Sequence, residues 1–196
     1  MLFNEKSPGV PWPGLANGPV RLRPLEYHDI EKVRSWRNDP EVAQFMVYRE
    51  FITKEQQEDW FHRIQKEKGF YAIIVVNGND IGLADLKNFS ADGKSAEGGI
   101  FVHSKAFQNS VYAYAVCILF LDFAFERLKL DIVEAKVIDR NARAVRFNNS
   151  LGYVRSEQDL APGVGLYFLT AEMYRKNVAA IRRALMVSLE QNFGGN

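Results

Sequence analysis

His103 stands where a general base could act. It directly follows the expected strand 96–102, and an unperturbed imidazole with a pKa of roughly 6.5 accepts a proton near neutral pH. His28 lies at the expected start of a helix and His62 within another, and neither has a matching partner nearby in the sequence. We therefore take His103 as a candidate catalytic residue and expect the other two histidines to be structural or solvent-exposed.

The single cysteine, Cys117, has the surroundings of a core residue. It lies in the apolar run Val116–Phe120, where a thiol behaves as a small hydrophobic group and not as a nucleophile. One cysteine and three scattered histidines give no metal-ligand spacing. Neither a Walker loop nor a dinucleotide-binding fingerprint occurs. We expect no metal site, and the cysteine usage suits a reducing compartment.

The 196-residue chain has the composition of one soluble globular domain, with 47% hydrophobic and 25% charged residues. Its formal net charge of +1 gives no broad field that would attract nucleic acid or an anionic membrane. The N-terminus lacks the pattern of a signal peptide, and Asp122, Glu126 and Arg127 interrupt the longest apolar run. We expect a cytoplasmic protein with no nucleic-acid or membrane partner.

Hydrophobic periodicity predicts an α/β (α+β) fold. The expected strands cover residues 20–23, 70–76, 81–86, 96–102, 132–138, 153–154 and 166–169, and the expected helices cover 30–36, 53–64, 111–128, 141–151 and 172–190. Asn77-Gly78 is a hairpin turn signal, Thr53 with Gln56 forms a capping-box pattern, and Gly152 fits a helix end. A strand meander followed by crossovers implies a mixed, mostly antiparallel central sheet flanked by helices.

Two segments resemble motifs of the GNAT superfamily of N-acetyltransferases. Asn141–Tyr153 is similar to the family's N-x-x-A-x-x-x-x-x-x-L-G-F segment, and Phe107–Ala113 is similar to its coenzyme-binding loop Q/R-x-x-G-x-G/A. The resemblance implies a GNAT-like sheet, with an irregular arm at 1–18, the acetyltransferase domain at 19–172 and a helical extension at 173–196. It also implies acetyl-CoA as co-substrate.

The resemblance further implies a set of coenzyme-binding residues: Phe101, Val102, Gln108, Asn109, Ser110, Val111, Tyr112, Ala113, Asn141, Ala144 and Asn148. Val111 stands where the family usually has glycine, which lets the backbone approach the pyrophosphate closely. Because the phosphate donors are backbone amides, we expect acetyl-CoA to bind with an altered loop geometry. Arg143 and Arg146 could meet the coenzyme phosphates.

Acetylation of an amine needs a base for the amine proton and donors for the thioester carbonyl. Ala96–Val102 resembles the family's a-E-x-G-y strand beside the acetyl site, which makes Glu97 the first candidate base and His103 the second. Asn148 falls where many family members have a tyrosine that protonates the CoA thiolate. An asparagine cannot act as that acid, so the acid is another group, such as Tyr112, Tyr114 or Tyr153, or solvent.

The segment Ser35–Val42, followed by Gln44-Phe45-Met46, resembles the N-acetyltransferases of pseudaminic acid biosynthesis, within a branch that also holds ribosomal-protein alanine acetyltransferases. The resemblance implies a small-molecule amine acceptor, with a nucleotide-linked aminosugar favoured. Substrate-binding candidates are Trp36, Arg37, Asn38 and Phe45. N-terminal peptide acetylation, a catalytically silent acyl-CoA-binding domain and a homodimer all remain open.

Overall fold

The computed structural model describes residues 14–108 and 110–193 and folds around one eight-stranded sheet with the order β1-β2-β3-β4-β5-β6-β8-β7. All neighbouring strands are antiparallel except β5 and β6. The strands are β1 (Leu15–Asn17), β2 (Val20–Pro24), β3 (Phe70–Val76), β4 (Asn79–Lys87), β5 (Ser95–Val102), β6 (Ile132–Ile138), β7 (Val154–Ala161) and β8 (Val164–Thr170). The mixed, mostly antiparallel sheet predicted from the sequence is confirmed.

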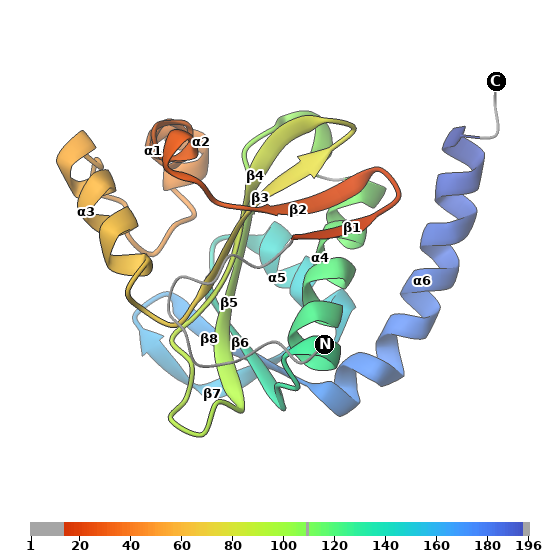
Figure 1. The fold of residues 1–196 in the computed structure, drawn as a ribbon. Helices are drawn as coiled ribbons and strands as arrows, with labels where there is room; N and C mark the ends of the chain where they lie inside the picture. The colour runs from red at the N-terminus through yellow and green to blue at the C-terminus, as the bar shows by residue number, and fades with distance from the viewer. Residues whose placement is uncertain (1–13, 109, 194–196) are drawn as a thin grey trace.

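Helices cover both faces of the sheet (Figure 1). They are α1 (Ile30–Asn38), α2 (Pro40–Ala43), α3 (Lys54–Ile64), α4 (Val111–Asp122), α5 (Ala142–Leu151) and α6 (Ala171–Phe193). One hydrophobic core lies between the sheet and α4, α5 and α6, and includes Ile74, Leu86, Val133 and Leu169. A smaller core joins the other face to α1 and α3 through Val33, Trp36 and Ile73. No helix within the described ranges is long and apolar enough to cross a membrane.

Local sequence signals explain several element boundaries. Thr53 and Gln56 form the expected capping box at the start of α3. Asn77 and Gly78 both have positive φ, 50° and 78°, in the two-residue turn that joins β3 to β4. That turn type needs a left-handed backbone at both positions, which Asn and Gly adopt at least cost. Helix α5 ends at Gly152, as its sequence indicates.

Three expectations about the elements were wrong. Residues 15–17, placed in the irregular arm, form strand β1, because the edge of β2 offers them a pairing partner; residues 1–13 lie outside the described residues. The helix expected over 111–128 ends at Asp122 and continues as a π-helical turn, Phe123–Arg127. A short helix, α2, follows Asp39, where no helix was expected. Its start is stabilised by the Asp39 side chain, which accepts a hydrogen bond from the Glu41 amide.

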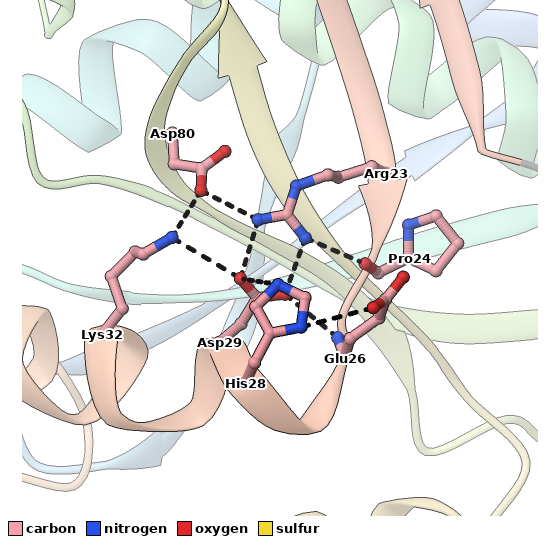
Figure 2. Close-up of polar contacts among 7 residues, drawn as sticks. All are labelled: Arg23, Pro24, Glu26, His28, Asp29, Lys32 and Asp80. Carbon is pink, nitrogen blue, oxygen red and sulfur yellow. Dashed lines mark hydrogen bonds and ion pairs between the residues drawn. The ribbon is translucent and has the colours of Figure 1, made fainter.

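A buried carboxylate fixes helix α1 to the sheet (Figure 2). The fully buried Asp29 accepts two hydrogen bonds from Arg23 of β2, at 2.6 and 2.7 Å, and one from the Glu26 amide. Asp80, at the start of β4, contacts both Arg23 and Lys32 of α1. The network therefore joins β2, β4 and α1 and sets the position of α1 beside the sheet.

Helix α6 packs on the core through its first half, where Tyr174 and Val178 are buried. Asp122 of α4 accepts hydrogen bonds from the Tyr174 hydroxyl and from Arg182, which links α4 to α6. Further along α6 (Figure 1), Ile181 and Leu185 are partly buried and pack against the same core. The domain limits at 19–172 and 173–196 stay a prediction.

Candidate active site

Strands β5 and β6 separate after a short paired stretch. They are parallel neighbours only over Ser95–Glu97 and Ile132–Glu134, whereas β5 stays paired with β4 to Val102 and β6 with β8 to Ile138. The facing edges beyond that stretch line a cavity of about 700 Å³. A cavity of this volume is large enough to bury a small-molecule ligand.

The open edge of β5 presents backbone groups to this cavity. The His103 amide donates to the Ile81 carbonyl on the β4 side. In an antiparallel pair the backbone groups of alternate residues point to opposite sides, so those of Gly98, Ile100 and Val102 face the cavity. In agreement, the Val102 carbonyl accepts a hydrogen bond from the Gln108 side chain at 2.9 Å. An extended ligand could therefore hydrogen-bond along β5 as an additional strand would.

One end of the cavity is formed by the start of α4. Gln108, Ser110 and Ala113 line it. The Ser110 hydroxyl donates to the Phe107 carbonyl and does not cap the helix. Within the described residues, the amides of Val111 and Tyr112 have no backbone acceptor, as expected in the first turn of a helix. This end therefore offers free N–H donors and the positive end of a helix dipole, which favour an anion.

The start of α5 lies at the same end of the cavity. The Asn141 side chain caps α5 by accepting from the Ala144 amide at 3.1 Å. Asn141, Ala144 and Asn148 line the cavity together with two arginines, Arg143 and Arg146. Arg143 also donates to the Gln108 side chain, which joins α5 to the loop before α4. The two helix starts and the arginines make this end electropositive.

The opposite end, where β5 and β6 meet, holds a row of charged side chains. Lys87 contacts Asp85 at 2.7 Å and Glu97 at 3.7 Å, and Lys136 contacts Glu97 at 2.7 Å. All four side chains line the cavity. Asp85 and Glu97 are each largely shielded from solvent, with 11% and 12% of the side chain exposed, so these contacts are only partly screened.

The Glu97 carboxylate is held in its charged form. Burial by itself raises the pKa of Glu97, but the hydrogen bond from Lys136, the charge of Lys87 and the hydrogen bond from Asn88 outweigh it, so the pKa lies below its usual value. Glu97 is therefore ionised throughout the neutral range and able to accept a proton, although its ion pairs weaken it as a base. The catalytic role of Glu97 stays a prediction.

Arg37 enters the cavity from α1. Its Nε atom is buried and has no hydrogen-bond partner among the described residues. Burial lowers the pKa of Arg37, and the nearby charge of Asp85 partly offsets that effect. A buried guanidinium with an unused donor is unfavourable unless a ligand completes its hydrogen bonds. Phe45 and Tyr48, in the loop after α2, also line the cavity.

Several other candidate residues do not line the cavity. His103 stacks on Trp36, with ring centroids 5.8 Å apart, and its Nε2 lies 3.2 Å from Asp39 in a shallow surface hollow. Trp36 belongs to the smaller core. The Asn38 amide exchanges two hydrogen bonds with the Ile52 backbone and fixes the loop before α3. These contacts are structural, and the catalytic role of His103 and the substrate-binding roles of Trp36 and Asn38 stay predictions.

The coenzyme candidates divide in the same way. Phe101, Val102, Gln108, Ser110, Ala113, Asn141, Ala144 and Asn148 line the cavity. Val111 and Tyr112 do not line it, although Ser110 and Ala113 on either side of them do. Asn109 lies outside the described residues.

Sequence reasoning missed Asp85, Lys87 and Lys136. A signal existed for the first two, because Asp85-Leu86-Lys87 places two charges on one face of an otherwise apolar strand. Buried charges in a strand need partners or a ligand. Glu134-Ala135-Lys136 shows the same pattern in β6, but it could not reveal that Lys136 pairs with Glu97 of a different strand. Among the described residues no group of three or more histidine, cysteine or acidic side chains could hold a metal ion.

Comparison with known sequences decides the family. The family model for the acetyltransferase (GNAT) domain matches residues 20–154. The chain belongs to the GNAT acetyltransferase family. It is therefore an N-acetyltransferase, and GNAT acetyltransferases use acetyl-CoA as the acetyl donor.

Two curated relatives support this membership. An uncharacterised N-acetyltransferase, p20, of Bacillus licheniformis is 26% identical over 140 residues, which cover 68% of this chain and 78% of the relative. The acetyltransferase PseH of Campylobacter jejuni is 23% identical over 142 residues, covering 69% of this chain and 83% of the relative.

Solved structures share the GNAT fold. An acetyltransferase from T. thermophilus superimposes with a TM-score of 0.69 at 23% identity, covering 88% of this chain and 96% of the other. The spermidine N-acetyltransferase of Vibrio cholerae, in complex with CoA and spermine, gives 0.67 at 22% identity, covering 81% and 99%. At these identities the likeness concerns the fold alone.

Proposed function

We propose that this protein transfers the acetyl group of acetyl-CoA to the amine of a nucleotide-linked aminosugar. The observation that carries the proposal is one continuous cavity, electropositive at the helix starts, edged by free backbone groups of β5 and lined by Arg37 at its far end. The helix starts suit the phosphates of the coenzyme, the β5 edge suits its extended arm, and Arg37 suits the phosphates of the acceptor.

The coenzyme fits the cavity in one direction. Its pyrophosphate would lie against the amides at the start of α4 and near Arg143 and Arg146, where charge and free donors favour anions. Its extended arm would then follow the open edge of β5 from Val102 toward Gly98. In this orientation the acetyl group ends near Glu97 and Asp85, and a backbone amide of β5 is available to polarise the thioester carbonyl.

The leaving thiolate needs a proton donor other than Asn148. Tyr114 lines the cavity, and its hydroxyl lies 3.0 Å from the Ser150 hydroxyl. Tyr153 is buried, which raises its pKa strongly and leaves it a poor acid. Tyr112 does not line the cavity. We therefore take Tyr114 as the candidate acid for the thiolate.

The acceptor end suits an amine that also carries an anion and a planar group. Arg37 can donate to a phosphate oxygen, and Phe45 and Tyr48 offer apolar and aromatic surface for a base or sugar ring. Asp85 and Glu97 are already neutralised by Lys87 and Lys136. A polycation such as spermidine would meet no surplus of negative charge here. The aminosugar assignment rests on the cavity and on the resemblance of Ser35–Val42 to the N-acetyltransferases of pseudaminic acid biosynthesis.

A CoA-release assay tests the proposal directly. The protein is given acetyl-CoA with a UDP-linked 4-amino-4,6-dideoxy sugar, with peptides that have a free N-terminus, or with spermidine. We expect turnover with the aminosugar nucleotide and little with spermidine. Turnover restricted to peptides would establish N-terminal acetylation instead. Binding of CoA without turnover of any amine would indicate a silent acyl-CoA-binding domain.

A further inference from the structure

We infer that Asp85 is the carboxylate that orients the acceptor amine, and that Gly99 keeps open the space in front of it. This inference rests on the proposed function, because it assigns the amine-contacting group within the same cavity. It goes beyond the candidate base, Glu97, whose two oxygens are already engaged by lysines and by Asn88.

Asp85 has one oxygen left for a ligand. The residue is 8% exposed, and its Oδ1 accepts from Lys87 at 2.7 Å. Its Oδ2 has no hydrogen-bond partner among the described residues. Asp85 lines the cavity, so this oxygen is open to a ligand at the acyl end. Such a group favours a donor that carries positive charge or several N–H bonds, as an amine does.

Gly99 lies directly opposite Asp85 in the β4–β5 pair. A Cβ atom at position 99 would lie 2.7 Å from Asp85 Oδ2, closer than real Cβ contacts permit. Any other residue would therefore displace the carboxylate. Because Gly99 also belongs to the β5 edge along which the coenzyme is proposed to lie, the free oxygen and the acetyl group would be close neighbours.

The charges around Asp85 fit this role. Lys87 holds Oδ1, and the charge of Arg37 acts on the same carboxylate from α1. Lys87 therefore occupies one oxygen of Asp85, while an approaching amine contacts the other. An acceptor with its phosphate on Arg37 and its amine on Asp85 would be held at two points, which fixes the direction of attack.

A ligand cycle tests the assignment. Binding of a UDP-linked 4-amino-4,6-dideoxy sugar and of its 4-hydroxy counterpart is measured by calorimetry with CoA bound, for the wild type and for Asp85→Asn. We expect the wild type to prefer the amine, and we expect Asp85→Asn to lose about tenfold or more of that preference. CoA affinity should change by less than about twofold, which also shows that the variant is folded.

Two variants serve as controls. Asp59→Asn removes an exposed carboxylate of α3 outside the cavity, and it should keep the amine preference. Gly99→Ala, with Asp85 retained, should reduce the preference because its Cβ displaces Oδ2. An unchanged preference in Asp85→Asn, or its loss in Glu97→Gln instead, would overturn the inference.

Failure of the proposed acceptor gives a different result. If the wild type binds CoA but neither sugar, the nucleotide-sugar assignment is wrong. The same cycle on the amine selected by the CoA-release assay, and on its hydroxyl analogue, then decides the role of Asp85. Equal amine preference in wild type and Asp85→Asn in that cycle would exclude Asp85.

Discussion

Lys136 of β6 and Glu97 of β5 form a 2.7 Å ion pair at the point where their two strands separate. The pair closes the narrow end of the cavity and places a charged carboxylate beside the expected position of the acetyl group. Lys87 and Asn88 hold the same carboxylate from β4 and the turn that follows it. The geometry therefore restricts Glu97 to one orientation, which a base and an electrostatic support would both need.

Replacement of Glu97 by glutamine separates these roles from coenzyme binding. If Glu97 accepts the amine proton, kcat should fall by roughly 10²–10⁴-fold. The apparent KM for acetyl-CoA should hardly change, because the coenzyme does not bind through this carboxylate. Steady-state kinetics with an acceptor that the wild type acetylates provide both values. Wild-type rates in Glu97→Gln at every pH would exclude Glu97, and a rate decrease in His103→Ala would then be the next test.

The pH profile offers a second test of Glu97. Burial alone raises the pKa of Glu97, but Lys136 and Lys87 lower it by more. The fall of kcat/KM on the acidic side of the pH profile should therefore lie at a pH below the usual carboxyl range. Lys136→Gln removes a hydrogen bond to the charged form and should move that fall to higher pH. The exposed Lys94 lies outside the cavity, and Lys94→Gln should leave the profile unchanged. A fall that stays at the same pH in Lys136→Gln would contradict the assignment.

The sequence predicted the fold well because its strongest signals are local. The Asn77-Gly78 turn, the Thr53 capping box and the β-branched run of β3 depend on neighbouring residues, and all appear in the structure. Strand β1 could not be predicted, because its three residues are held by pairing with β2 and not by any propensity of their own.

The candidate site was predicted less completely, since cross-strand contacts set it. The register places Lys87 opposite Glu97, and the separation of β5 from β6 opens the cavity that both line. Neither fact can be read from periodicity. Trp36 and Arg37 illustrate the same limit: adjacent in sequence, one lies in the core and the other in the cavity, because successive helical residues point about 100° apart.

Val111→Gly tests whether the departure from the family's loop pattern matters. Val111 is the first residue of α4, and its side chain does not line the cavity. Since the phosphate donors are backbone amides, we expect CoA affinity to change by less than about threefold, with a stability loss of about 1 kcal/mol from the added backbone freedom. Calorimetry with CoA and urea unfolding measure the two effects. A large gain in CoA affinity would show that the valine obstructs the loop.

Asp29→Asn should destabilise the fold by about 3 kcal/mol at neutral pH, because it leaves Arg23 without its buried partner. The hydrogen bonds from Arg23 and the Glu26 amide outweigh burial and lower the pKa of Asp29. A lowered pKa contributes stability above the unfolded-state value, roughly 3.9, that is lost as pH falls through the folded-state value. The difference in the free energy of unfolding between the wild type and Asp29→Asn, measured by urea unfolding, should therefore become smaller at acidic pH.

The exposed Asp59 of α3 provides the control for this effect. Asp59→Asn should change stability by less than about 0.5 kcal/mol at any pH, because surface substitutions without specific contacts are nearly neutral. A pH-independent deficit in Asp29→Asn would show that packing, and not the ionised carboxylate, makes its contribution.

Arg37 should bind the anionic part of the acceptor. Arg37→Ala should weaken acceptor binding by roughly 1.5–3 kcal/mol, the range of a charge-assisted hydrogen bond, with CoA affinity nearly unchanged because the coenzyme phosphates bind at the other end of the cavity. Arg37→Lys should restore only part of the loss, since an ammonium cannot make the planar two-point contact.

Arg63→Ala, an exposed position of α3, should have no effect on either ligand. Calorimetry with the UDP-linked aminosugar measures the losses. Loss of CoA binding in Arg37→Ala, or its failure to fold, would make Arg37 structural and favour an N-terminal peptide as acceptor.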